Sequence, residues 1–156
     1  MDKLVVIAGT NASGKSGLGI KLAKHYGAEI VSADSRQVFK GLDLGSGKVS
    51  IEEMQVVPHY LLDVAKPNDF FSLAKYQELA YDAINDIISR KKKPFLVGGT
   101  GLYVNSIVDG YNLSKVEPTS EIRSLVESKS LEELIQILKD KNPDATNERH
   151  HNMTGK

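Results

Sequence analysis

The stretch Gly9-Thr10-Asn11-Ala12-Ser13-Gly14-Lys15-Ser16 decides the fold of this chain. It fits the pattern G-x-x-x-x-G-K-[ST], in which a glycine-rich turn surrounds a phosphate group. The apolar residues 4–8 come before it and are typical of a strand that is buried in a parallel sheet. For residues 15–26, which follow, we predict a helix. We therefore expect residues 9–16 to form a phosphate-binding loop between a strand and a helix.

The chemistry of this loop follows from its residue types. Glycines let the backbone turn tightly and direct several N–H groups toward an anion, and the start of the helix adds positive potential. Lys15 supplies a mobile positive charge, and the Ser16 hydroxyl is a suitable ligand for Mg²⁺. Residues 9–16 thus predict a bound phosphate or pyrophosphate with Mg²⁺ at Ser16. They do not say whether the phosphate is transferred, hydrolysed or expelled.

Composition narrows the class of protein. The 156 residues are enough for one domain with a real core, and the absence of cysteine excludes disulfides and fits a reducing compartment. Only five apolar residues separate Lys3 from Gly9, which is too few for the apolar region of a signal peptide. No apolar stretch reaches the length of a membrane span. Twenty basic and 20 acidic residues balance, so any nucleic-acid contact has to be a local patch. We expect a monomer in the cytoplasm without membrane contact.

The pattern of the remaining segments predicts the fold class. Further strands are expected at residues 28–32 and 94–97, a short apolar segment at 58–64, and a loop at 35–48. Residues 73–90 have apolar side chains at helical spacing. Strands that alternate with helices indicate an α/β fold of the P-loop NTPase type, with a parallel sheet in a three-layer arrangement. Asp34 and Thr100 follow strand ends, so we expect them to meet the phosphate loop in one crevice.

The pattern changes after about residue 111. We predict a short helix near residues 121–127, and Ser130 with Glu133 forms a capping box for a second helix. Residues 142–156 are polar, and we expect them to be loosely ordered. We therefore assign residues 1–112 to a catalytic core and residues 113–156 to the start of a helical insertion with its tail.

Three polar positions beside the loop leave alternatives open. Asp34 is either a residue near a bound Mg²⁺ or a general base. Gln37 could read a base edge with two hydrogen bonds, or it could be an ordinary polar loop residue. The glycines around Thr100 could allow backbone and a hydroxyl to approach a ligand closely, or they could form an ordinary turn. We find no arginine-rich lid of the kind that phosphoryl transfer usually needs.

Four motifs in order resemble those of the tRNA dimethylallyltransferases. They are the loop at residues 9–16, the stretch Ser32-Ala33-Asp34-Ser35-Arg36-Gln37 that continues to Gly45, Val57-Pro58-His59, and Gly98-Gly99-Thr100-Gly101-Leu102-Tyr103. The resemblance implies transfer of a dimethylallyl group from dimethylallyl diphosphate to N6 of the adenosine 3′-adjacent to the tRNA anticodon. Pyrophosphate is the expected leaving group, held by the loop, Lys15 and Mg²⁺.

The resemblance also implies roles for individual residues. Asp34 would accept a proton from the adenine amine, and Thr100 would hydrogen-bond the oxygen that joins the allylic carbon to the diphosphate. The expected tRNA contacts are Asp34, Ser35, Arg36, Gln37 and Arg123. The expected partners are the anticodon stem-loop and dimethylallyl diphosphate.

Length is the main departure from the family. Its members are roughly twice as long, and here residues 147–156 resemble two ends of one basic helix whose middle is absent. We therefore interpret the chain as a truncated or internally deleted form. Two alternatives stay open: a P-loop kinase of small molecules or nucleosides, and an inactive remnant that binds diphosphate or tRNA.

Overall fold

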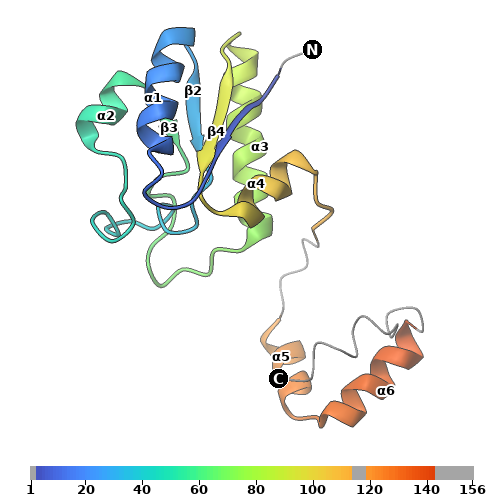
Figure 1. Ribbon diagram of the computed structural model, residues 1–156. Helices are drawn as coiled ribbons and strands as arrows, with labels where there is room; N and C mark the ends of the chain where they lie inside the picture. The colour runs from blue at the N-terminus through green and yellow to red at the C-terminus, as the bar shows by residue number, and fades with distance from the viewer. Residues whose placement is uncertain (1–2, 114–118, 143–156) are drawn as a thin grey trace. The chain divides into compact units, whose positions relative to one another are not determined.

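The computed structural model describes residues 3–113 and 119–142, and these two ranges belong to two separate compact units (Figure 1). The elements of the first unit are β1 (Val5–Ala8), α1 (Lys15–Tyr26), β2 (Glu29–Ser32), α2 (Ile51–Val56), β3 (His59–Tyr60), α3 (Leu73–Ser89), β4 (Pro94–Gly98) and α4 (Gly101–Val108). The second unit contains α5 (Ser120–Glu127) and α6 (Leu131–Lys141).

The four strands form one parallel sheet in the order β1-β4-β2-β3. Leu96 at the centre of β4 lies opposite Val6 of β1 on one side and Val31 of β2 on the other. Because β4 is inserted between the first two strands of the chain, its end and the ends of β1 and β2 meet at one edge. This arrangement confirms the predicted parallel α/β sheet.

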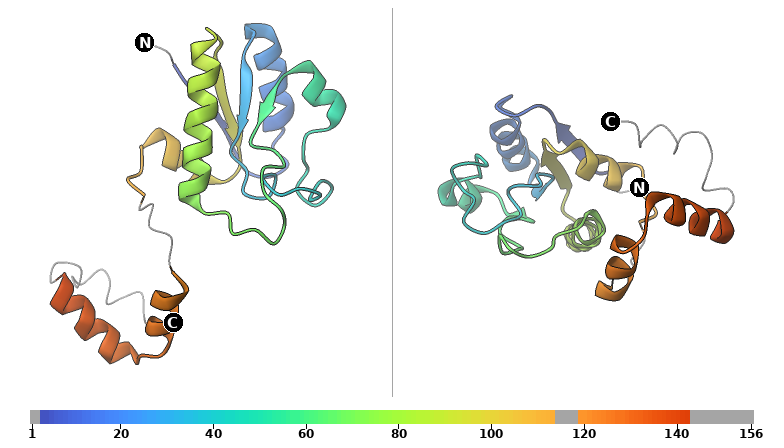
Figure 2. Two further views of the ribbon diagram at one scale, coloured as in Figure 1. Left: turned by 180° about the vertical axis from the view of Figure 1, so that it is seen from behind. Right: turned by 90° about the horizontal axis from the view of Figure 1, so that it is seen from below.

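Helices cover both faces of the sheet, which gives the predicted three layers (Figures 1 and 2). Alternate strand residues point to opposite faces. Val31 and Leu96 pack with α3 and α4, whereas Ile30 and Phe95 pack with α1. Each face of the two central strands therefore has its own apolar core.

The prediction that residues 4–8 form a buried strand is wrong as regards burial. Val5 and Val6 are 37% and 38% exposed, and Ala8 is exposed as well. The reason is strand order: β1 lies at the edge of the described sheet, and among the residues described it pairs with β4 alone. A continuous apolar run is typical of a strand covered on both faces, but it does not reveal where in the sheet the strand lies.

Most helix predictions agree with the structure. α1 has the expected bounds, and α3 ends at Ser89, one residue before the predicted end. The sequence did not predict α2 or α4. For α2 a signal was present, because Ser50 and Glu53 form a capping box of the same kind as the one recognised at Ser130.

The second unit consists of two short helices with polar caps. The Thr119 hydroxyl accepts a hydrogen bond from the Ile122 amide, and the predicted capping box of Ser130 and Glu133 is formed. Neither helix has a buried residue in the described structure. The tail predicted at residues 142–156 lies outside the described residues except for Asn142.

In the described ranges of the chain, we find no helix that has the length and apolar character needed to span a membrane.

An ion pair between a buried carboxylate and a half-buried arginine holds the end of α3 to the sheet. The Glu29 side chain is 5% exposed and accepts two hydrogen bonds from Arg90, both at 2.7 Å. The Tyr60 hydroxyl donates to the same carboxylate at 2.8 Å. These hydrogen bonds, those from Arg90 above all, stabilise the ionised form and hold the pKa of Glu29 below its ordinary value of 4.5.

This pair predicts a loss of stability in acid. Because the pKa of Glu29 is lower in the folded chain than in the unfolded one, its contribution is fully present above about pH 5. It is lost progressively as the pH falls through 4.5 and then through the lowered folded pKa. Glu29→Gln should cost about 1–3 kcal/mol at pH 7 and flatten the acid side of the stability profile.

Urea unfolding followed by circular dichroism between pH 3 and 7 measures this effect. Glu78→Gln is the matched control, because Glu78 pairs with Lys75 at 3.1 Å on the surface of α3 and is 52% exposed. Such exposed pairs contribute little to stability. Equal profiles for the two variants would contradict the prediction.

Candidate functional site

The phosphate loop at residues 9–16 connects β1 to α1, as predicted. Gly14 precedes the first residue of α1 and has a φ of 81°, and Ala12 also has a positive φ, 59°. Positive φ is uncommon for alanine and marks a backbone held in a special conformation. The first turn of α1 contains no acidic residue, so the positive end of this helix is not neutralised from within.

Lys15 lies at the centre of this loop. Its ammonium group donates a hydrogen bond to the Thr10 carbonyl at 3.0 Å. Gly99, after β4, approaches the same side chain so closely that a Cβ there would lie 3.2 Å from the Lys15 Nζ. The absence of a side chain at Gly99 therefore makes room for the lysine, which is a physical reason for glycine at this position.

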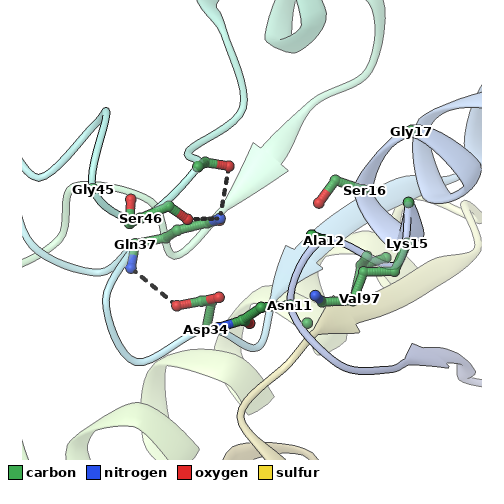
Figure 3. A pocket seen from close by; sticks show the side chains of 13 residues that line it. Asn11, Ala12, Lys15, Ser16, Gly17, Asp34, Gln37, Gly45, Ser46 and Val97 are labelled. Carbon is green, nitrogen blue, oxygen red and sulfur yellow. Dashed lines mark hydrogen bonds between the residues drawn. The ribbon is translucent and has the colours of Figure 1, made fainter.

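One cavity of about 490 Å³ joins the loop to the end of β2 (Figure 3). Lys15 and Ser16 lie on one side of it, and Asp34 and Gln37 lie on the other. The full lining is Asn11, Ala12, Gly14, Lys15, Ser16, Gly17, Asp34, Gln37, Gly45, Ser46, Gly47, Val97 and Gly98. Of the residues expected to converge here, the loop and Asp34 share the cavity, whereas Thr100 is not part of its lining.

Asp34 is partly buried and its backbone turn is well defined. Its Oδ1 accepts hydrogen bonds from the Arg36 amide at 2.9 Å and the Gln37 amide at 3.4 Å. Within the described residues, Oδ2 accepts none, so one carboxylate oxygen stays available to a ligand. The neighbouring Tyr103 has a raised pKa, chiefly because it is buried and also because the Asp34 charge is near.

Thr100 does not line the cavity, and its hydroxyl is hydrogen-bonded to Ser35, the residue after Asp34. Its hydroxyl accepts a hydrogen bond from the Ser35 amide at 2.9 Å and lies 3.2 Å from the Ser35 hydroxyl. Either hydroxyl can supply the proton of that second bond. When Ser35 supplies it, Thr100 keeps its own proton for an oxygen of a bound ligand.

The remaining predicted residues differ in what surrounds them. Gln37 is buried, and its amide nitrogen donates to the Ser46 and Gly47 carbonyls, both at 3.3 Å, so the side chain is engaged within the protein. Arg36 is exposed at the end of the same turn. Arg123 is exposed on α5 in the second unit.

The wall formed by Gly45, Ser46 and Gly47 was not recognised as part of a site. The sequence indicated a loop at residues 35–48 with three glycines, and that was its only local signal.

For Mg²⁺, the Ser16 hydroxyl and the Asp34 carboxylate offer oxygen ligands in one cavity, which is the donor type that this ion prefers. The described residues contain no cluster of three acidic or histidine side chains that would hold a metal by itself.

Comparison with known proteins gives consistent results. A sequence model of the IPP transferase family matches residues 37–156. The tRNA dimethylallyltransferase of Thermoanaerobacter sp. (strain X514) is 43% identical over 154 residues, which cover 96% of this chain and 49% of that protein. The tRNA dimethylallyltransferase of Roseiflexus sp. (strain RS-1) is 46% identical over 132 residues, or 85% of this chain and 43% of that one.

Solved structures agree with this result. The full-length tRNA isopentenylpyrophosphate transferase of Bacillus halodurans matches with a TM-score of 0.71 and 40% identity, covering 93% of this chain and 49% of that one. A eukaryotic dimethylallyltransferase acting on tRNA matches with a TM-score of 0.78 and 28% identity, covering 93% and 37%. The chain thus spans about half the length, or less, of these relatives.

Proposed function

The chain belongs to the IPP transferase family, and from this premise we propose that it is the diphosphate-binding core of a tRNA dimethylallyltransferase. The proposed reaction moves a dimethylallyl group from dimethylallyl diphosphate to N6 of the adenosine 3′-adjacent to the tRNA anticodon. The observation that carries the proposal is the shared cavity, in which a phosphate loop faces one carboxylate across a space large enough for both reacting groups.

The residues of the cavity fit the steps of such a reaction. The adenine N6 attacks the allylic carbon, a C–N bond forms, and the C–O bond to the diphosphate breaks. Pyrophosphate leaves with the electron pair of that bond, and Lys15 and the backbone N–H groups of the loop stabilise its charge. The proton lost by N6 passes to the Asp34 carboxylate.

Two further groups have supporting roles in the proposal. Thr100 directs its hydroxyl toward the oxygen that joins the allylic carbon to the diphosphate. Mg²⁺ bound by Ser16 would neutralise part of the diphosphate charge. The adenine has to leave its stack to enter the cavity, and the exposed Arg36 is positioned on the turn next to Asp34 for a contact with RNA. A tRNA acceptor would place the reaction in the cytoplasm.

The experiment combines the chain with labelled dimethylallyl diphosphate, Mg²⁺ and an anticodon stem-loop, beside a version with the length of the relatives. Label in the RNA and release of pyrophosphate support the proposal, and both should disappear in Lys15→Ala, which removes the central charge of the loop. A parallel reaction with labelled ATP and nucleosides tests the kinase alternative. Phosphate transfer there, without prenyl transfer, would contradict the proposal.

A further inference from the structure

Lys48 is a buried lysine beside the cavity that the proposed reaction does not use. Its side chain is 3% exposed, although lysine is rarely buried to this degree. It follows directly after Gly47, the last residue of the wall opposite the phosphate loop, yet it does not line the cavity. A lysine so close to a phosphate site would ordinarily be interpreted as a phosphate ligand.

The hydrogen bonds of Lys48 exclude that interpretation for the described conformation. Its ammonium group lies 2.6 Å from the Asp63 Oδ1, 2.7 Å from the Asp43 Oδ1 and 3.0 Å from the Phe39 carbonyl. An ammonium group has three donors, and three acceptors use them all. Two carboxylates against one ammonium leave this cluster with a net charge of about −1. The cluster therefore connects parts of the protein to one another, and its negative charge would not attract a diphosphate.

Lys48 connects the loop at residues 41–48 to two other segments, one at Phe39 and one at Asp63. Phe39 comes before residues 41–48, Asp43 lies inside that loop, and Asp63 follows β3. Asp63 has a φ of 56°, in the left-handed region, and its amide donates to the Gln37 carbonyl at 3.2 Å. The ion pair thus ties the loop to a backbone segment that is itself fixed in a special conformation.

Gln37 holds the same wall from the other side. Its amide nitrogen donates to the Ser46 and Gly47 carbonyls (Figure 3). Its Oε1 accepts from the Ser32 hydroxyl at the end of β2. The wall is therefore held by hydrogen bonds from two buried groups, the Gln37 side-chain amide and the Lys48 ammonium group. Because Asp34 also follows β2, the wall and the Asp34 carboxylate are both held at the end of the same strand.

We propose that Lys48 is a positioning residue that, through Asp43 and Asp63, holds residues 41–48 as the fixed far wall of the phosphate cavity. The inference rests on the proposed function in naming a diphosphate donor as the ligand. We call the loop closed when the Lys48 ion pairs are formed. If only the closed loop binds the ligand well, the apparent affinity equals the intrinsic affinity multiplied by the fraction of closed molecules. When the donor is bound, nearly all molecules have the closed loop, so the rate of the chemical step after binding does not change.

Lys48→Met is the appropriate variant because methionine keeps an unbranched apolar stem and removes the charge. Asp43 and Asp63 are 64% and 41% exposed, so water can solvate both carboxylates when the ammonium group is gone. Lys48→Arg retains the charge in a different shape. Lys75→Met is the matched control, since Lys75 is 51% exposed on α3 and pairs only with Glu78 among the described residues.

Two measurements test the proposal. Calorimetric titration with Mg²⁺ and inorganic pyrophosphate should show about tenfold weaker binding for Lys48→Met, a smaller loss for Lys48→Arg, and no change for Lys75→Met. Hydrogen exchange should be at least about tenfold faster at the amides of Gly47 and Lys48, which bond to the Leu44 and Asp43 carbonyls. In prenyl transfer, KM for the donor should rise by the same factor while kcat stays within about twofold.

The outcomes separate this inference from the proposed function. Unchanged pyrophosphate affinity together with unchanged exchange would overturn the role of Lys48. So would a fall in kcat at constant KM, because that result indicates loss of active protein or a part in the chemistry. If the unaltered chain binds no pyrophosphate, the proposed function fails, and the exchange rates alone decide whether Lys48 holds the loop.

Discussion

Asp34→Asn is expected to lower kcat for prenyl transfer about 10²–10⁴-fold, the range typical for removal of a general base. Asparagine has nearly the same shape as aspartate, and its Oδ1 can still accept the Arg36 and Gln37 amides that define the turn. It cannot take up the proton from N6. Affinity for pyrophosphate should stay within about threefold, because asparagine keeps the turn after β2 and leaves both the phosphate loop and the wall at residues 41–48 in place.

The measurement is a single-turnover rate with labelled donor and stem-loop. Asp69→Asn is the control: its carboxylate also accepts a backbone amide, that of Lys66 at 2.8 Å, in an exposed turn that does not line the cavity. Asp34→Ala, which also removes the acceptor of the turn, should lose both rate and affinity. A rate near that of the unaltered protein in Asp34→Asn would show that another group accepts the proton.

Gly98→Ala is expected to lower the free energy of unfolding by at least about 3 kcal/mol, the upper end of the usual cost of overpacking. A Cβ at this position would lie 2.1 Å from the Ala33 carbonyl oxygen and 2.3 Å from the carbonyl carbon. Both are backbone atoms, and Ala33 is itself held by hydrogen bonds to Val97 at 2.8 Å and Thr100 at 3.1 Å. The clash therefore has to move β4 away from the end of β2.

Gly101→Ala provides the comparison, because a Cβ at Gly101 meets no atom within 4 Å and alanine favours a helix start over glycine. Urea unfolding should separate the two variants clearly. Since Ala33 precedes Asp34, Gly98→Ala should also displace the carboxylate and weaken prenyl transfer beyond the loss of folded protein. Equal stability of the two variants would contradict the packing argument.

The features that the sequence predicted well depend on residues close together in the chain. The phosphate loop is eight consecutive residues, and α1 and α3 follow from apolar side chains at helical spacing. The meeting of Asp34 with that loop could also be predicted, because parallel strands end at one edge of their sheet.

The features that could not be predicted depend on contacts between distant residues. Nothing near Lys48 in the sequence shows that Asp63, 15 residues away, lies 2.6 Å from its ammonium group. Gln37 was open to two interpretations because its partners at Ser46 and Gly47 are known only once the loop is folded. The same limit applies to β1, whose place at the edge depends on the insertion of β4 between β1 and β2.

That edge has a practical consequence for handling the protein. In the described part of the chain, one side of β1 presents unpaired backbone donors and acceptors with half-exposed valines beside them. An open strand edge of this kind can act as a template for pairing between molecules. The chain has zero net charge at pH 7, so long-range repulsion does not oppose such encounters. We therefore expect self-association through β1 near neutral pH, and buffers well away from neutrality, together with low concentration, should reduce it.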